Sequence, residues 1–256
     1  MLSRLLPTCV VAVLVFLVDP SRASAEFVTL KYDGSVNPTV TTSLQPNAPT
    51  GPFSWHDNNL PPNANFPPPT STFCIEPTGS ILPSVGTSVV FDVRGLAAAP
   101  TIGTAAKANA VTELYGRFYQ SAWGQAGFTG SSDSVAFQLA LWEIITDGPP
   151  TAGNTNELSN GTFRVSSGIG APYTTAKSWL NQMNGDASSF NTRFSGQELV
   201  ALVAPAPGAK QQDCVQDQIA LRPNSAVPAP PGVILAGIGF LGLLGRARLS
   251  RRKATA

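Results

Sequence analysis

Short runs in which apolar and polar residues alternate occupy mainly the first third of the chain and its last part. In residues 27–32 (FVTLKY), for example, every second side chain is apolar. A period of two is typical of a β-strand with one buried face. The alternation therefore predicts strands at residues 27–32, 53–56, 72–76, 88–93, 161–165, 199–203 and 219–221.

Apolar residues at helical spacing are found between these strands. Thr104 can cap a first helix, whose apolar face begins with Val111 and Leu114. A second helix is predicted over residues 132–146 and a third over residues 175–183. The predicted fold class is therefore α+β, a β-rich, sandwich- or barrel-like domain with two or three inserted helices.

The second predicted helix carries a glutamine, Gln138, at the centre of its apolar face. A buried amide without a partner costs about 1–3 kcal/mol, so Gln138 needs one. Two kinds of partner fit: a neighbouring backbone, as for most buried amides, or a group with reactive chemistry. A helical wheel places Val135, Leu141, Trp142 and Ile145 beside Gln138, and Ala136, Ala140, Glu143 and Asp147 on the opposite, outward-facing side.

Cys74 is the candidate for a reactive partner. It lies in the predicted strand at residues 72–76, where alternation places it with the polar side chains of the strand. A purely structural cysteine would more often share the apolar face. The apolar face holds Phe73 and Ile75, and the face of Cys74 holds Thr72 and Glu76.

Two short motifs, FC at residues 73–74 and FQLAL at residues 137–141, resemble those of the bacterial surface thioester domains. In that family an aromatic or apolar residue precedes a cysteine, and a glutamine among apolar residues begins a helical string. The string QLALWEII at residues 138–145 is also similar to the family's helix. The resemblance implies an internal thioester between Cys74 and Gln138, shielded from water by Phe73, Phe137 and Trp142.

The same resemblance implies a covalent adhesin and not an enzyme. An amine on a target surface would displace the Cys74 thiol and become joined to Gln138 by an amide bond. Such a domain acts once and needs no cofactor. The alternative is a non-reactive structural or extracellular-matrix-associated binding domain of the same fold.

The N-terminus has the pattern of a secretory signal peptide. Arg4 precedes an apolar run over residues 5–18, and residues 23–25 (ASA) supply the small residues that signal peptidase accepts. The run is shorter than the ~20 apolar residues that span a bilayer. We therefore expect signal peptidase to remove residues 1–25, and residues 26–222 to form the globular domain.

The C-terminus combines three features in a fixed order. A proline-rich linker at residues 223–231 leads into residues 232–256, an apolar segment followed by arginines that the positive-inside rule keeps cytoplasmic. This order resembles the PEP-CTERM sorting tail, which a membrane protease, exosortase, recognises and cuts. Ala229 stands where that family usually has a glutamate. The resemblance implies an exported protein at the cell envelope, cell surface or extracellular matrix, anchored transiently or permanently by a C-terminal transmembrane segment.

Charge and cysteine content narrow the remaining classes. Charged residues make up 12% of the chain and the formal net charge is +1, without a basic stripe, which argues against nucleic acid as a partner. Once the signal peptide is removed, Cys74 and Cys214 remain. In an oxidising compartment two cysteines usually form a disulfide, and a Cys74–Cys214 bridge would preclude the thioester.

Other combinations of reactive or metal-binding residues match the sequence less well than the Cys74–Gln138 pair. His56, the only histidine, would form a hydrolase-like dyad with Cys74. Asp92 or Asp133 would complete it, but no family motif surrounds these residues. Too few ligands are present for a zinc site. The candidate calcium ligands, whose spacing matches no calcium loop, are Asp213, Asp217 and Glu198.

Overall fold

The computed structural model describes residues 26–35, 38–57, 66, 70–78, 83–125, 128, 130–150, 158–165, 169–204 and 215–224. All of these belong to one compact unit. The predicted signal peptide, the sorting tail, Cys214 and most of the predicted linker lie outside the described residues. Within the described part, no helix is both long and apolar enough to cross a membrane.

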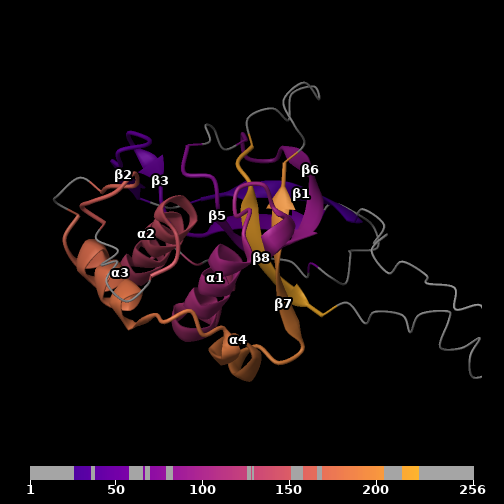
Figure 1. Ribbon diagram of the computed structural model, residues 1–256. Coiled ribbons are helices and arrows are strands. Elements are labelled where there is room, and N and C mark those ends of the chain that lie inside the picture. Colours follow the sequence, from indigo (N-terminus) through magenta and orange to yellow (C-terminus); the bar gives the residue numbers. More distant parts are fainter. Residues whose placement is uncertain are drawn as a thin grey trace, which may run out of the picture. The chain divides into compact units, whose positions relative to one another are not determined.

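Six antiparallel strands form a closed barrel (Figure 1). Each strand pairs with the next, and β1 also pairs with β6, so the sheet has no free edge. The prediction of an α+β, β-rich, barrel-like domain is therefore confirmed. In barrel order the strands are β1 (Glu26–Gly34), β4 (Phe53–Asp57), β5 (Thr70–Cys74), β8 (Gln218–Pro223), β7 (Gln197–Val203) and β6 (Ser88–Gly95).

Alternate residues of each strand fill the barrel interior. The rings of Tyr32 and Trp55 lie 4.9 Å apart, and those of Trp55 and Phe91 lie 5.3 Å apart in an edge contact. All three side chains are buried. The period of two read from the sequence is thus the alternation between the interior and the outer face of the barrel.

Within the described residues, four α-helices accompany the barrel, one more than the upper number predicted. The first three correspond to the predicted helices, and the Thr104 hydroxyl caps the first by accepting from the Lys107 N–H at 3.2 Å. The helices are α1 (Ala105–Phe118), α2 (Ser132–Asp147), α3 (Ala171–Gln182) and α4 (Ser188–Arg193), with short 3₁₀ turns η1 (Leu96–Ala98) and η2 (Ser121–Gly124) and a small hairpin of β2 (Thr39–Val40) and β3 (Ala48–Pro49).

The strand predicted at residues 161–165 is wrong. Only an isolated bridge, from Val165 to Thr42, is present there. The carboxylate of Asp147 instead accepts hydrogen bonds from the backbone N–H groups of Thr162 and Phe163, each at 2.9 Å. These bonds use main-chain donors that a strand ladder would need, so the segment is held as a loop beneath the end of α2.

The prediction that α2 turns one face outward is also wrong. Ala136 and Ala140 are buried, and Glu143 is only 1% exposed. The reason is that α2 packs against α1 and also against α3, so it is covered on more than one side. Interpreting a helical wheel in this way assumes that one face of the helix is covered and the other is exposed to solvent. This does not hold for a helix that lies between two neighbouring helices.

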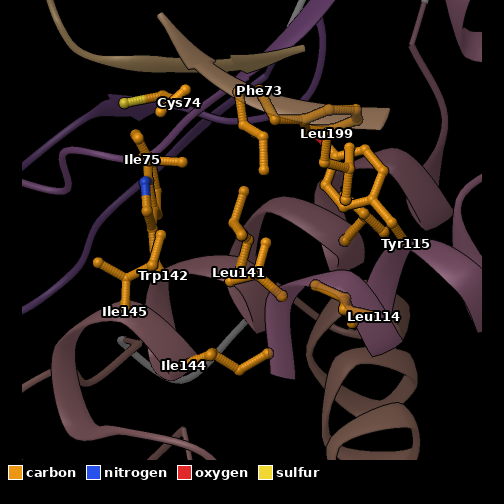
Figure 2. Packing of buried hydrophobic residues seen from close by; sticks show 14 of the residues in the cluster. Phe73, Cys74, Ile75, Leu114, Tyr115, Leu141, Trp142, Ile144, Ile145 and Leu199 are labelled. Atoms are coloured by element: carbon orange, nitrogen blue, oxygen red, sulfur yellow. The ribbon is translucent and has the colours of Figure 1, made fainter. Parts of the chain in front are cut away.

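An aromatic cluster joins β5 to the helices. Phe73 points out of the barrel and lies 4.8 Å, ring centre to ring centre, from Phe137 of α2. Figure 2 shows Phe73 and Tyr115 on facing elements. This packing fixes α1 and α2 against the end of β5. The cluster consists of Phe73, Tyr115, Tyr119, Trp123 and Phe137.

Candidate functional site

Cys74 is the last residue of β5, at a point where the neighbouring strand β4 has already ended. The β4–β5 pairing runs from Trp55↔Thr70 to Phe53↔Thr72 and goes no further. On the other side, the Ile75 N–H donates to the Asp217 carbonyl of the chain leading into β8, at 2.9 Å. Successive residues of a strand direct their main-chain groups to opposite sides. The N–H and C=O of Cys74 therefore face the side that β4 leaves empty.

The side-chain amide of Gln138 fills that place. Its Nε2 donates to the Cys74 carbonyl oxygen at 2.7 Å, and its Oε1 accepts from the Cys74 N–H at 3.2 Å. The amide thus pairs with Cys74 as a neighbouring strand would. The structure brings the two predicted site residues, 64 positions apart in the chain, into direct contact, and neither is exposed to solvent.

The Cys74 thiol makes different contacts from its backbone. Its Sγ donates to the Glu76 carbonyl at 3.4 Å and accepts from the Glu76 N–H at 3.3 Å. Burial raises the pKa of the Cys74 thiol to about 12, an effect that the Glu76 main chain and the Trp142 indole N–H oppose and the nearby Glu76 and Asp217 carboxylates increase. Cys74 is a free cysteine in the structure, and its resting form is the neutral thiol.

The three side chains predicted to shield the site are all buried. Phe73 and Phe137 belong to the aromatic cluster, and Trp142 packs edge-on against Phe163 with ring centres 6.0 Å apart. Figure 2 shows the Trp142 ring beside Ile75, with Cys74 beyond Ile75. Water is therefore excluded from Gln138 and Cys74 by side chains from both strands and helices.

A second buried glutamine, Gln218, was not predicted from the sequence. It is the register partner of Cys74 on β8. Because the Cys74 main chain faces away from β8, this is a non-hydrogen-bonded pair, in which side chains approach most closely. The Gln218 Oε1 accepts from the Thr72 hydroxyl at 2.9 Å, and its Nε2 donates to the Gln216 carbonyl at 3.2 Å. The predicted strand began one residue later, so the pattern gave no signal for this side chain.

The alternative chemical groups are not assembled around Cys74. His56 points out of β4 and bonds the Asp33 carboxylate at 2.6 Å. Asp92 pairs with Arg94, and Asp133 accepts from the Gln120 amide at 3.2 Å. The alternative of a hydrolase-like dyad therefore lacks its histidine and carboxylate partners beside Cys74.

The candidate calcium ligands are also separated. Asp217 accepts from the Thr101 hydroxyl at 2.6 Å and from the Ala204 N–H at 2.9 Å, and Glu198 pairs with Arg222. Asp213 lies outside the described residues. In the portion of the chain that the structure describes, no group of three or more acidic, histidine or cysteine side chains is placed to hold a metal ion.

No family model, curated protein or solved structure matched this chain when it was compared with them. The motifs around Cys74 and Gln138, and the contact between the two residues, are therefore the observations that bear on function.

The contact has a definite chemical consequence. A hydrogen bond from the Cys74 N–H to Oε1 draws electron density from the Gln138 carboxamide carbon and stabilises negative charge that develops on that oxygen. The Cys74 thiol belongs to the same residue as this donor. The Gln138 carboxamide carbon and a donor for its oxygen thus lie together in a dry site, and that donor is the main chain of the residue that carries the thiol.

Proposed function

We propose that this protein forms an internal thioester between Cys74 and Gln138 and uses it for single-use covalent attachment to amines. The observation that carries the proposal is the fully buried Gln138 carboxamide, held through both of its polar atoms by the main chain of Cys74. The resemblance of the surrounding motifs to bacterial surface thioester domains supports the same conclusion.

Thioester formation exchanges one bond for another within the protein. The Cys74 sulfur attacks the Gln138 carboxamide carbon, the bond from that carbon to Nε2 breaks, and the nitrogen leaves as ammonia with the thiol proton. An incoming primary amine later attacks the same carbon. The carbon–sulfur bond then breaks, the sulfur takes a proton from the amine, and an amide remains. Because the acyl group is not regenerated, the domain acts once and is not an enzyme.

The predicted chain ends support display on the outside of the cell. A signal peptide handled by signal peptidase and a PEP-CTERM-like tail handled by an exosortase-like membrane protease would deliver the domain to the envelope, cell surface or extracellular matrix. The partner of the reactive site is then an amine-bearing molecule on another surface. We propose no nucleic acid partner and no cofactor.

A second candidate function, a non-reactive structural or matrix-associated binding domain, is favoured by a specific observation. Both polar atoms of the Gln138 amide are satisfied, and the Cys74 sulfur is hydrogen-bonded to Glu76 and not to Gln138. In this interpretation Gln138 simply takes the place of the absent β4 neighbour. The raised pKa of the thiol is consistent with an inert cysteine.

Intact-mass spectrometry of the freshly purified mature domain separates the two functions. The thioester predicts a mass lower by one ammonia, and a gain of one methylamine on incubation with that amine. Cys74→Ala and Gln138→Ala should each show the full mass and no methylamine adduct. An unmodified mass in the wild-type protein would refute the thioester, and a Cys74–Cys214 linked peptide in a non-reducing digest would show which bond replaces it.

A further inference from the structure

The indole N–H of Trp142 is a polar group without a hydrogen bond in the described part of the structure. Trp142 is only 1% exposed, so water does not satisfy this donor. An unsatisfied buried donor destabilises the folded state, which makes such groups uncommon and points to a partner present at another stage of the protein's action. The surroundings of the indole identify that partner.

Trp142 is aimed at the site by its place on α2. It follows Gln138 by four residues, one helical turn, so both side chains lie on the same face of the helix. Figure 2 shows the indole nitrogen at the end of the ring turned toward Ile75 and Cys74. This N–H also acts on the Cys74 thiol in the direction that lowers its pKa, against the larger effect of burial.

The Cys74 sulfur has one other donor directed at it and two carboxylates nearby. The Glu76 N–H donates to Sγ at 3.3 Å. The Glu76 and Asp217 carboxylates act in the opposite sense, because their charges disfavour a thiolate. Two N–H groups, those of the Glu76 main chain and the Trp142 indole, can thus stabilise negative charge on the sulfur in this dry site. The indole N–H has no other hydrogen-bond partner in the described part of the structure.

We propose that the Trp142 indole N–H is a catalytic donor that, with the Glu76 main-chain N–H, stabilises negative charge on the Cys74 sulfur while the thioester forms and opens. The proposal rests on the proposed thioester and assigns Trp142 a chemical role besides shielding. In formation the sulfur is the nucleophile, and the thiol proton leaves with ammonia. In opening the sulfur is the leaving group and receives its proton from the attacking amine. The indole keeps its own proton in both steps.

The first test measures the Cys74 thiol itself. The thiol pKa is read from the Cβ chemical shift of Cys74 against pH, on protein whose cysteine is free. That protein is the untreated domain if no thioester forms, and the methylamine-opened domain if one does. Trp142→Phe should raise this pKa further, because a hydrogen bond to the charged sulfur is lost. An unchanged pKa overturns the proposal whether or not the thioester exists.

The second test measures the rate of opening by methylamine, followed by intact mass. Trp142→Phe should slow opening about tenfold or more. Without the indole hydrogen bond the thiolate is less stable, and a less stable thiolate is a poorer leaving group. The matched control is Trp55→Phe, which removes another fully buried indole, one whose N–H already donates to the Thr72 hydroxyl at 2.9 Å. This control should lower stability and change neither the thiol pKa nor the rate. Equal effects from both substitutions would assign Trp142 a packing role only.

A third variant covers the case in which Trp142→Phe does not fold. Trp142→benzothienylalanine keeps the bicyclic shape and replaces the N–H by sulfur. The same pKa rise and rate loss are expected, and wild-type behaviour overturns the proposal. If the wild-type protein shows no loss of ammonia, the proposed function fails and the role of Trp142 fails with it. An unchanged pKa or rate in a protein that does lose ammonia overturns the role of Trp142 alone.

Discussion

Cys74 lies between two buried glutamines that differ in what holds their amides. Gln218 approaches from β8 and directs its amide along the barrel interior, to the Thr72 hydroxyl and the Gln216 carbonyl. Gln138 approaches from α2 and directs both polar atoms to the main chain of Cys74. Both side chains are fully buried and satisfied. Burial of an amide therefore does not by itself single out the reactive one.

The difference lies in the group that polarises each carbonyl. The oxygen of Gln138 accepts from the N–H of the residue that bears the nucleophile, whereas the oxygen of Gln218 accepts from a threonine hydroxyl. Only the first arrangement couples the position of the carboxamide to the position of Cys74. The comparison thus supports Gln138 as the acyl donor of the proposed thioester and Gln218 as a structural residue, and both roles are testable.

The largest expected effect comes from Gln138→Ala. We expect it to be less stable than Cys74→Ala by roughly 2–6 kcal/mol, because it leaves the buried N–H and C=O of Cys74 unpaired while Cys74→Ala keeps them paired. Neither variant can form the thioester, so the cross-link does not enter the comparison. Urea unfolding measures the difference, and equal stabilities would mean that the amide pairing contributes nothing.

The next effect is a pH dependence of stability that arises at Glu143 on α2, the helix that carries Gln138. Burial, with a smaller contribution from the Asp147 charge, raises the pKa of Glu143 to about 8. The folded protein therefore binds this proton more tightly than the unfolded chain, whose glutamates titrate near about 4.3. The stabilisation is complete below that pH and is lost as the pH rises toward 8.

Between about pH 5 and pH 8 we expect this loss to be roughly 2–4 kcal/mol. Glu143→Gln should flatten the dependence, as measured by thermal unfolding across that range. The matched control is Glu198→Gln, because Glu198 lies on β7 in a partly exposed pair with Arg222. A wild-type slope that persists in Glu143→Gln would contradict the assignment.

A smaller effect is expected from Gln218→Ala. Removing this amide takes away the acceptor of the Thr72 hydroxyl and one donor to the Gln216 carbonyl, and should cost roughly 1–3 kcal/mol. The loss of ammonia expected for the proposed thioester, measured by intact mass, should be the same as in the wild-type protein. The opposite pattern, with ammonia loss abolished by Gln218→Ala and retained in Gln138→Ala, would exchange the roles of the two glutamines.

The smallest effect is expected from His56→Ala, which lies outside both amide environments. Its half-exposed pair with Asp33 should contribute less than about 1 kcal/mol, because solvent screens it. Ammonia loss and methylamine uptake should both remain at the wild-type level. A loss of either property in His56→Ala would support the hydrolase-like pair of His56 and Cys74.

The sequence predicted the parts of this arrangement that depend on local pattern. Thr104 caps α1 as expected, and the strands that form the barrel were found from their alternation. Gln138 is inside because its apolar neighbours recur at helical spacing. Its placement against Cys74 was expected from family motifs, since periodicity alone does not identify which buried groups meet.

The errors share a physical cause, which is that tertiary contacts decide what a local pattern leaves open. Glu143 is buried because two helices cover α2. Residues 161–165 are held as a loop by the Asp147 carboxylate from the end of that helix. Gln218 lies at the first position of a strand, where two or three residues of alternation cannot fix the inward face.

The place that Gln138 takes beside Cys74 has a consequence for when the proposed thioester can form. The two residues meet only after β5 has joined the barrel and α2 has docked on it, which requires contacts between distant parts of the chain. In the unfolded chain the cysteine and the glutamine are apart, so the proposed thioester cannot form there. If the domain is exported unfolded, as we propose, it would become reactive toward amines only after it folds at its destination.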